Sequence, residues 1–164
     1  RRCLRFYMPT PPKPLDAIDK RILAIVQVDA SLAIGEIANR VGLSQTPCWK
    51  RLQRLEQTGF IKRRIALLDQ VKLGLGLTAF VSIEVGEHSA AMQEKFAADV
   101  IAMKEVMDFY RMAGDVDYML RVVVSDTAAF DAFYKRLVGL APLKSVKSRF
   151  ALENLKAETA LPIH

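Results

Sequence analysis

Seven basic side chains between residues 40 and 64 carry the strongest chemical signal in this 164-residue sequence. They are Arg40, Lys50, Arg51, Arg54, Lys62, Arg63 and Arg64, and the single acid among them is Glu56. The local excess of six positive charges equals the formal net charge of the whole chain, +6, so the remaining residues are neutral in sum. A local concentration of lysine and arginine is the electrostatic footprint expected of a surface that binds nucleic-acid phosphates.

A helix over residues 46 to 58 would position several of these charges. At 100° per residue, Cys48, Leu52 and Leu55 share one face. The opposite face carries Thr46, Lys50, Gln53, Arg54 and Gln57. Two starts fit the sequence, Thr46 as N-cap before Pro47 or Ser44 half a turn earlier, and Gly59 supplies the stop. One face therefore packs, and the other is available to a ligand.

The preceding residues predict two further helices. One of them is indicated by apolar residues at i, i+3, i+4 and i+7 spacing, which are Ile34, Ile37, Ala38 and Val41. Gly42 then ends this helix. Upstream, Asp16 can cap a first helix whose apolar face holds Ile18, Ile22, Ile25 and Val26. Two short helices joined through a glycine turn are typical of a helix-turn-helix domain. Residues 60 to 68 are β-capable and carry three cations, which indicates a wing or an extended linker beside a duplex.

The residues after Gly76 predict a second core with the element order βαββαβ. Leu77 to Val85 alternates apolar and polar residues, as a half-buried strand does. A helix around residues 92 to 103, strands at 106 to 113 and 118 to 124, a helix after Asp126 and a last strand at 146 to 155 follow. This order favours a ferredoxin-like sandwich with two helices on one face of an antiparallel sheet. Alternation places Phe80, Met107, Phe109 and Met119 on the other face, which favours pairing with a second copy.

Composition narrows the class of protein. With 51% hydrophobic and 26% charged residues the chain is globular, and no apolar run approaches the roughly 20 residues needed to cross a bilayer. The N-terminus lacks a signal-peptide apolar region, so we expect a cytoplasmic protein with no membrane partner. Cys3 and Cys48 make neither a disulfide framework nor a metal cluster, and Cys48 is interpreted as a small buried apolar residue. Residues 1 to 14, rich in proline and basic residues, are predicted to be a mobile arm that either touches DNA or is only a leader.

Enzymatic function is disfavoured by the residues present. The histidines are His88 and His164, and neither a Ser/His/Asp or Cys/His arrangement nor a metal-ligand spacing appears. Asp115 and Asp117 stand two apart on a predicted turn, a spacing that suits capping or ligand binding better than acid/base catalysis. The sequence therefore predicts no catalytic residues, no metal and no cofactor.

Several separated motifs resemble the Lrp/AsnC family of bacterial transcription regulators, also called feast/famine regulators, over residues 15 to 162. The motifs are Leu-Asp-Ala-Ile-Asp at 15 to 19, Val-Gly-Leu-Ser at 41 to 44, Thr-Pro-Cys-Trp-Lys-Arg at 46 to 51, Leu-Glu-Gln-Thr-Gly-Phe-Ile at 55 to 61, Ala-Leu-Leu-Asp at 66 to 69, Gly-Asp-Val-Asp-Tyr at 114 to 118, and Leu-Pro-Ile at 161 to 163. The resemblance implies a winged helix-turn-helix and an effector-binding domain that dimerises through its sheet. It also implies that dimers often assemble into an octamer, a tetramer of dimers.

The same resemblance implies that an amino acid binds between subunits near the turn at 114 to 118. Carried over, the candidate effector-binding residues are Gly114, Asp115, Asp117 and Tyr118, with Met112 and Ser148 as neighbours. Alternatively, the glycine only turns the chain and the aspartates only cap it. The segments at 46 to 51 and 109 to 122 further resemble the branch of the family that responds to cysteine, which makes cysteine the candidate effector.

Three positions depart from the family pattern. Ala33 stands where a Ser or Thr helix cap is usual, which would typically cost about 1 kcal/mol. Arg63 and Arg64 replace a usual Gly-Tyr pair and add positive charge. Ser148 replaces a common Thr in the last strand, so the hydroxyl is kept and the pocket volume changes.

Together these patterns predict an α+β protein that regulates transcription by binding specific sites in double-stranded DNA. The expected divisions are the arm at 1–14, a helix-turn-helix domain at 15–62, a wing or linker at 63–76, and an effector-binding and oligomerisation domain at 77–164. A homodimer would place two copies of the 46–58 helix in successive major grooves, about 10 base pairs apart. An alternative is an architectural protein that packages DNA without an effector.

The predicted DNA contacts fall into three groups. Gln45, Thr46 and Gln53 are expected to read bases. The cations Lys50, Arg51, Arg54, Arg63 and Arg64 are expected to grip phosphates, with Lys50 or Arg54 also able to meet a guanine edge. Trp49 either contacts a sugar or thymine methyl group or packs, and Arg51 could equally hold a structural ion pair.

Overall fold

A computed structural model describes residues 14–86 and 89–163, which form two compact units. The first unit runs to Ala66 and is completed by residues from Lys156 onward. The second comprises Leu67–Leu155. Residues 1–13 of the predicted arm, together with His88 and His164, lie outside the described residues.

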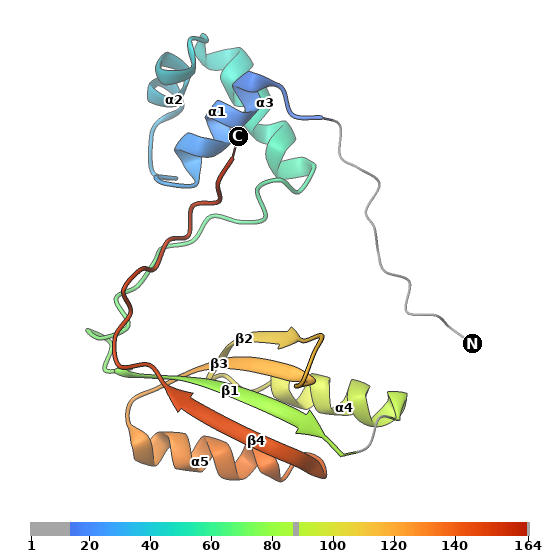
Figure 1. The fold of residues 1–164 in the computed structure, drawn as a ribbon. Helices are drawn as coiled ribbons and strands as arrows, with labels where there is room; N and C mark the ends of the chain where they lie inside the picture. Colours follow the sequence, from blue (N-terminus) through green and yellow to red (C-terminus); the bar gives the residue numbers. More distant parts are fainter. Residues whose placement is uncertain (1–13, 87–88, 164) are drawn as a thin grey trace. The chain divides into compact units, whose positions relative to one another are not determined.

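Three helices, α1 (Ala17–Val26), α2 (Ile34–Val41) and α3 (Gln45–Gln57), build the first unit (Figure 1). A capping box begins α1, in which the Asp19 N–H donates to Asp16 Oδ1 over 2.8 Å. Ala33 precedes α2 without a side-chain cap, as predicted, and Gly42 ends it at φ 74°, a conformation that favours glycine. Ser44 occupies the N-cap position of α3, so the earlier of the two predicted starts is confirmed.

The core of this unit lies where the three apolar stripes meet. Ile22 of α1, Ile37 of α2 and the predicted α3 face of Cys48, Leu52 and Leu55 are all buried. Burial raises the pKa of the Cys48 thiol, which therefore stays protonated and packs as a small apolar side chain.

The end of the chain also packs on the first unit. The Gln27 side-chain amide bonds both backbone groups of Leu161, since Nε2 donates to the Leu161 carbonyl over 3.0 Å and Oε1 accepts from its N–H over 2.8 Å. Ile163 packs against the core of the three helices. Residues 156–163 therefore belong to the first unit, whereas the sequence places them in the C-terminal domain.

The second unit is an α+β sandwich with the predicted βαββαβ order. Its elements are β1 (Leu77–Val85), α4 (Ala90–Ile101), β2 (Val106–Arg111), β3 (Tyr118–Val124), α5 (Thr127–Val138) and β4 (Leu143–Phe150). The antiparallel sheet has the strand order β2-β3-β1-β4, and both helices cover one of its faces (Figure 1). The Asp126 cap of α5 is confirmed, because Asp126 Oδ1 accepts from the Ala129 N–H over 2.8 Å. β4 ends at Phe150, earlier than predicted.

Alternation along β1 is confirmed for its apolar residues from Ala79 to Val85, although Ser82 on the opposite face is also buried. Ala79, Val81, Ile83 and Val85 are buried on the helix face, and Phe96 of α4 and Phe133 of α5 pack on them. Phe80 lies on the open face and is 41% exposed. The sandwich is therefore held by an apolar layer between sheet and helices, which leaves the other side of the sheet uncovered.

The prediction for Phe109 is wrong. A bulge between Val106 and Asp108 shifts the pairing of β2 with β3, and this reverses which residues point to the helices. Phe109 therefore turns inward, with its ring 5.2 Å from that of Tyr118, while Met107 stays 49% exposed.

Candidate nucleic-acid interface and effector region

One side of α3 is open to solvent. Thr46, Trp49 and Lys50 are exposed there, and Gln53 is half-buried. Gln45 begins the helix and lies against Gly35 of α2, where an added Cβ would come within 2.9 Å of the Gln45 Nε2 atom. Glycine at 35 thus leaves room for the Gln45 amide, which α2 holds beside the exposed side of α3.

Two arginines of α3 turn toward α1 instead. Arg51 Nη1 lies 2.9 Å from Asp19 Oδ1 and also bonds Asp16, and Arg54 bonds the other oxygen of Asp19. The hydrogen bond from the Asp19 N–H lowers the pKa of Asp16 most, and the bond from Arg51 lowers it further. In turn, the carboxylates of Asp16 and Asp19 raise the pKa of Arg51. The structural ion pair considered for Arg51 is therefore present, and Arg54 shares it.

Further cations of the basic segment also have acidic partners. Arg64 Nη2 lies 2.7 Å from Glu56 Oε1, and Arg40 pairs with Glu36 one turn earlier in α2. In residues 40–64, Lys50, Lys62 and Arg63 are left without an ion pair to any residue that the structure describes. Counting charges within the segment missed the partners of Arg40, Arg51 and Arg54, because Glu36, Asp16 and Asp19 lie outside it.

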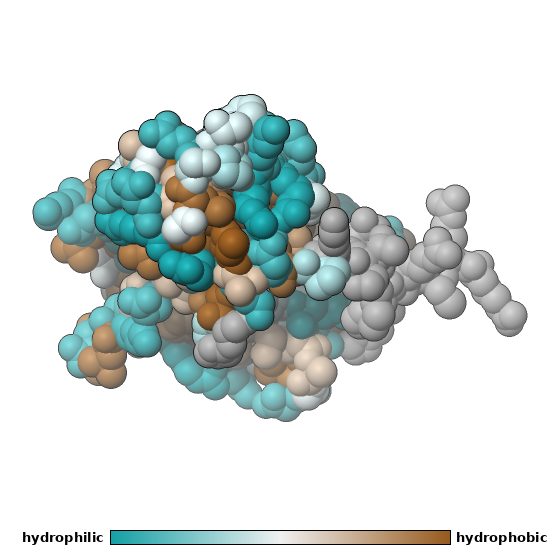
Figure 2. All heavy atoms as spheres, turned by 90° about the horizontal axis from the view of Figure 1, so that it is seen from above, coloured by the Kyte–Doolittle hydropathy of each residue, from teal (hydrophilic) through white to brown (hydrophobic). Residues whose placement is uncertain are grey.

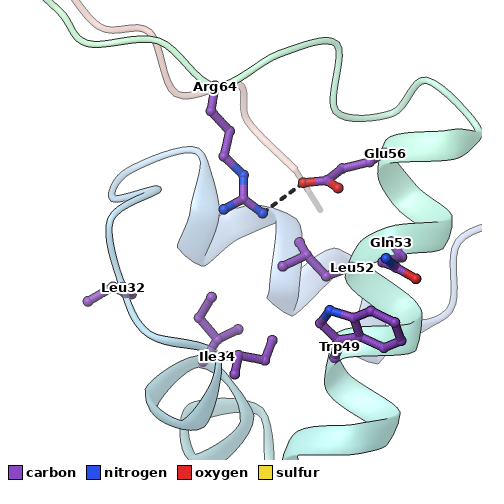
Figure 3. Close-up of a pocket in the computed structure, with 8 residues that line it drawn as sticks. Leu32, Ile34, Trp49, Leu52, Gln53, Glu56 and Arg64 are labelled. Carbon is purple, nitrogen blue, oxygen red and sulfur yellow. Dashed lines mark hydrogen bonds and ion pairs between the residues drawn. The ribbon is translucent and has the colours of Figure 1, made fainter.

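A hollow of about 230 Å³ opens between α2, α3 and the segment after α3 (Figure 3). Ile34 and Leu52 form apolar walls, Trp49 stands beside them, and the Arg64–Glu56 pair lies at its edge. Figure 2, which looks onto the first unit, shows hydrophilic side chains around a smaller apolar area. Trp49 thus both lines a hollow and remains 48% exposed, so packing and contact with a ligand are both open to it.

The turn between β2 and β3 is the candidate effector region. Gly114 has φ 133°, and the Met112 N–H closes the turn on the Asp117 carbonyl over 2.8 Å. Met112, Gly114 and Asp115 are exposed. Asp117 has a structural contact, since its Oδ2 accepts from the Val85 N–H over 2.8 Å and thereby fastens the end of β1.

The other two candidate effector residues point into the sandwich. Tyr118 is buried, with its ring 5.6 Å from Phe96 and 5.2 Å from Phe109. Ser148 pairs with Val81 on the helix face, and its Oγ is buried without a hydrogen-bond partner in the described structure. The six candidates are therefore not brought together around one open site within a single chain.

The described residues present neither a metal site nor a membrane-spanning helix. Within residues 14–86 and 89–163, no group of three or more His, Cys, Asp or Glu side chains is placed to hold a metal ion. None of the described helices combines the length and the apolar character needed to cross a bilayer.

Comparison with known proteins decides the family. The family described as the Lrp/AsnC ligand binding domain matches residues 78–161, and winged helix-turn-helix DNA-binding matches residues 15–62. The chain belongs to the Lrp/AsnC family. It is a DNA-binding transcriptional regulator with an Lrp/AsnC ligand-binding domain, as the sequence resemblance implies.

Similar regulators share nearly its full length. The DNA-binding transcriptional activator DecR of Escherichia coli K12 is 49% identical over 91% of this Lrp/AsnC chain and 99% of its own. The glutamate uptake regulatory protein of Zymomonas mobilis is 42% identical, with 92% of each chain covered. An AsnC family regulator from Agrobacterium tumefaciens superposes with TM-score 0.88 at 50% identity, covering 90% and 97%. A Neisseria meningitidis regulator solved with L-methionine superposes with TM-score 0.87 at 33% identity, covering 91% of this chain and 97% of its own.

Proposed function

We propose that this Lrp/AsnC regulator recognises specific sites in double-stranded DNA through the exposed side of α3. The observation that carries the proposal is Lys50, an exposed cation with no acidic partner among the described residues, next to the exposed Thr46. Gln45, Thr46 and Gln53 read base edges, while Lys50 and Arg63 contact phosphates. Trp49 adds a contact to a sugar or a thymine methyl group at the border of this surface.

The protein acts as a homodimer in this proposal, with the open faces of two sheets packed together. Phe80, Met107 and Tyr110 leave apolar surface uncovered in the second unit, and a second copy is the economical way to bury it. The dimer presents two α3 helices to successive major grooves, about 10 base pairs apart. Following the family resemblance, four dimers assemble into an octamer, and the protein works in the cytoplasm.

An amino acid is the proposed effector, and it binds at the β2–β3 turn. Met112, Gly114 and Asp115 are exposed there, the turn's N–H groups can meet a carboxylate, and Asp115 can meet an α-ammonium group. A second copy completes the site, with Asp117, Tyr118 and Ser148 shaping it from behind. The Neisseria relative was solved with L-methionine, and the resemblance of residues 46–51 and 109–122 favours cysteine for this chain.

Footprinting on genomic DNA fragments tests the proposal. We expect discrete protected sites with two half-sites about one helical turn apart, and a change in protection when cysteine or another amino acid is added. Uniform protection with no response to any amino acid would contradict sequence-specific regulation and favour an architectural role. A thermal-shift screen against the amino acids identifies the effector independently, because specific binding raises the melting temperature by mass action.

A further inference from the structure

An ion-pair cluster joins α1 to α3, and it consists of Asp16, Asp19, Arg51 and Arg54. Its two arginines lie next to the proposed DNA-contacting side of α3. Arg51 follows Lys50 in the chain, and Arg54 lies one turn after Lys50 on the same helix. Asp16 is the N-cap of α1, and Asp19 in the first turn is 2% exposed. Both carboxylates therefore sit at the positive end of α1, where a negative charge is favoured.

The two arginines remain within reach of a ligand from solvent. Their side chains are 28% and 41% exposed, so the guanidinium groups are held by the carboxylates without being enclosed. A carboxylate and a phosphate present similar acceptors to a guanidinium group, and both make short charge-assisted bonds. A phosphate approaching α3 must therefore displace a carboxylate that is already in place.

We propose that Asp16 and Asp19 compete with DNA phosphates for Arg51 and Arg54, and so limit binding of the regulator to DNA of any sequence. The inference rests on the proposed role of α3 in DNA binding. Phosphate contacts supply sequence-independent affinity, whereas base contacts supply discrimination. Withholding two cations from the backbone lowers affinity for random DNA and leaves base reading by Gln45, Thr46 and Gln53 in place.

The test measures the salt dependence of binding to a random-sequence duplex for the full-length protein and Asp16→Asn/Asp19→Asn. Asparagine is as good an N-cap as aspartate at position 16, and at position 19 its amide oxygen can still accept from the residue 16 N–H, so the start of α1 is kept while the charge is removed. Two freed arginines should steepen the slope of log K against log salt by about 1.8, since each phosphate contact adds about 0.9. Between 50 and 200 mM salt the variant should lose about tenfold more affinity than the wild type.

A matched control separates this effect from a general change in charge. Asp131→Asn/Glu94→Gln removes two exposed acids from α5 and α4 in the second unit. Its slope should equal that of the wild type. An unchanged slope for Asp16→Asn/Asp19→Asn, or an equal rise in the control, overturns the proposal.

A second set of variants removes the arginines instead, and its first member is made in the wild-type background, where the result does not depend on how the double variant folds. Arg54→Gln in the wild-type background should leave the slope unchanged, because Arg54 is already occupied by Asp19. In the Asp16→Asn/Asp19→Asn background, Arg51→Gln/Arg54→Gln should restore the wild-type slope. A slope flatter by about 0.9 for Arg54→Gln alone would show that Arg54 already grips phosphate and would overturn the proposal.

The outcomes distinguish this inference from the proposed function. If the wild type does not bind DNA in a salt-dependent way, both fail. If it binds and Lys50→Ala flattens the slope, while the aspartate and arginine variants behave contrary to expectation, the proposed function stands and the competition does not.

Discussion

The three-helix unit and the sheet unit place their ion pairs differently. In the first, Asp19 is buried between α1 and α3 and holds two arginines of α3, the helix that we propose contacts DNA. In the second, pairs such as Lys135–Asp131 and Lys144–Glu84 lie at the surface over an apolar core. Exposed pairs contribute little to stability, whereas a buried carboxylate depends on its partners. The packing of α3 in the first unit therefore combines an apolar face with a partly buried ion pair, while the sandwich rests on its apolar layer.

The largest effect is expected from the core of the second unit. Phe133→Ala removes a fully buried ring between α5 and the sheet and should lower the free energy of unfolding by about 3–5 kcal/mol. Circular dichroism, which reports both units, follows this loss. Trp49 is the only tryptophan and lies in the first unit, so its fluorescence reports the unfolding of that unit by itself. A loss below about 1 kcal/mol would show that the apolar layer does not hold the sandwich.

The next effect sharpens the contrast between the two kinds of ion pair. Asp19→Ala removes the shared acceptor of Arg51 and Arg54 and should lower the free energy of unfolding of the first unit by about 2 kcal/mol. Urea unfolding monitored by Trp49 fluorescence measures this loss. Asp131→Ala, the control at the surface of α5, should cost less than about 0.5 kcal/mol. Equal costs for the two variants would erase the difference between the units.

A smaller effect is expected where the chain end packs on the three helices. Gln27→Ala removes both bonds to the Leu161 backbone and should cost about 1 kcal/mol in the unfolding of the first unit. Gln57→Ala, an exposed amide at the end of α3, is the control and should leave stability within about 0.5 kcal/mol of the wild type. If the two variants are alike, the contact with Leu161 adds nothing to stability.

The smallest effect is expected on the stability of the protein at acid pH. Hydrogen bonds from the Ala129 N–H and then from the Ser125 hydroxyl lower the pKa of Asp126 below its ordinary value. A lowered folded pKa means that this contribution to stability is fully present above the unfolded pKa, near 3.8, and is lost as pH falls through the folded value. Asp126→Asn keeps the cap and should flatten the fall in melting temperature between about pH 5 and pH 3. An unaltered acid profile would remove Asp126 as a contributor.

Local signals in the sequence predicted much of this molecule. The apolar face of α3 and the caps Asp16 and Asp126 depend on neighbours within a few residues, and all are confirmed. Phe109 was placed on the wrong face because the bulge in β2 is set by its register with β3, which the alternation within β2 alone does not show.

Long-range contacts account for the rest. Arg54 meets Asp19 35 residues away, and Gln27 meets Leu161 134 residues away, so no local pattern could reveal either contact. In the effector region, the turn at Gly114 was predicted, but the inward direction of Tyr118 and Ser148 depends on how the sheet packs against its helices.

The most direct test of DNA binding through α3 is a comparison of Lys50→Ala with Lys135→Ala across a salt series on a footprinted site. Both variants remove one exposed lysine, the first from α3 and the second from α5 of the other unit. Lys50→Ala should bind more weakly, with a slope flatter by about 0.9, while Lys135→Ala should match the wild type. Indistinguishable slopes for the two variants would contradict the account.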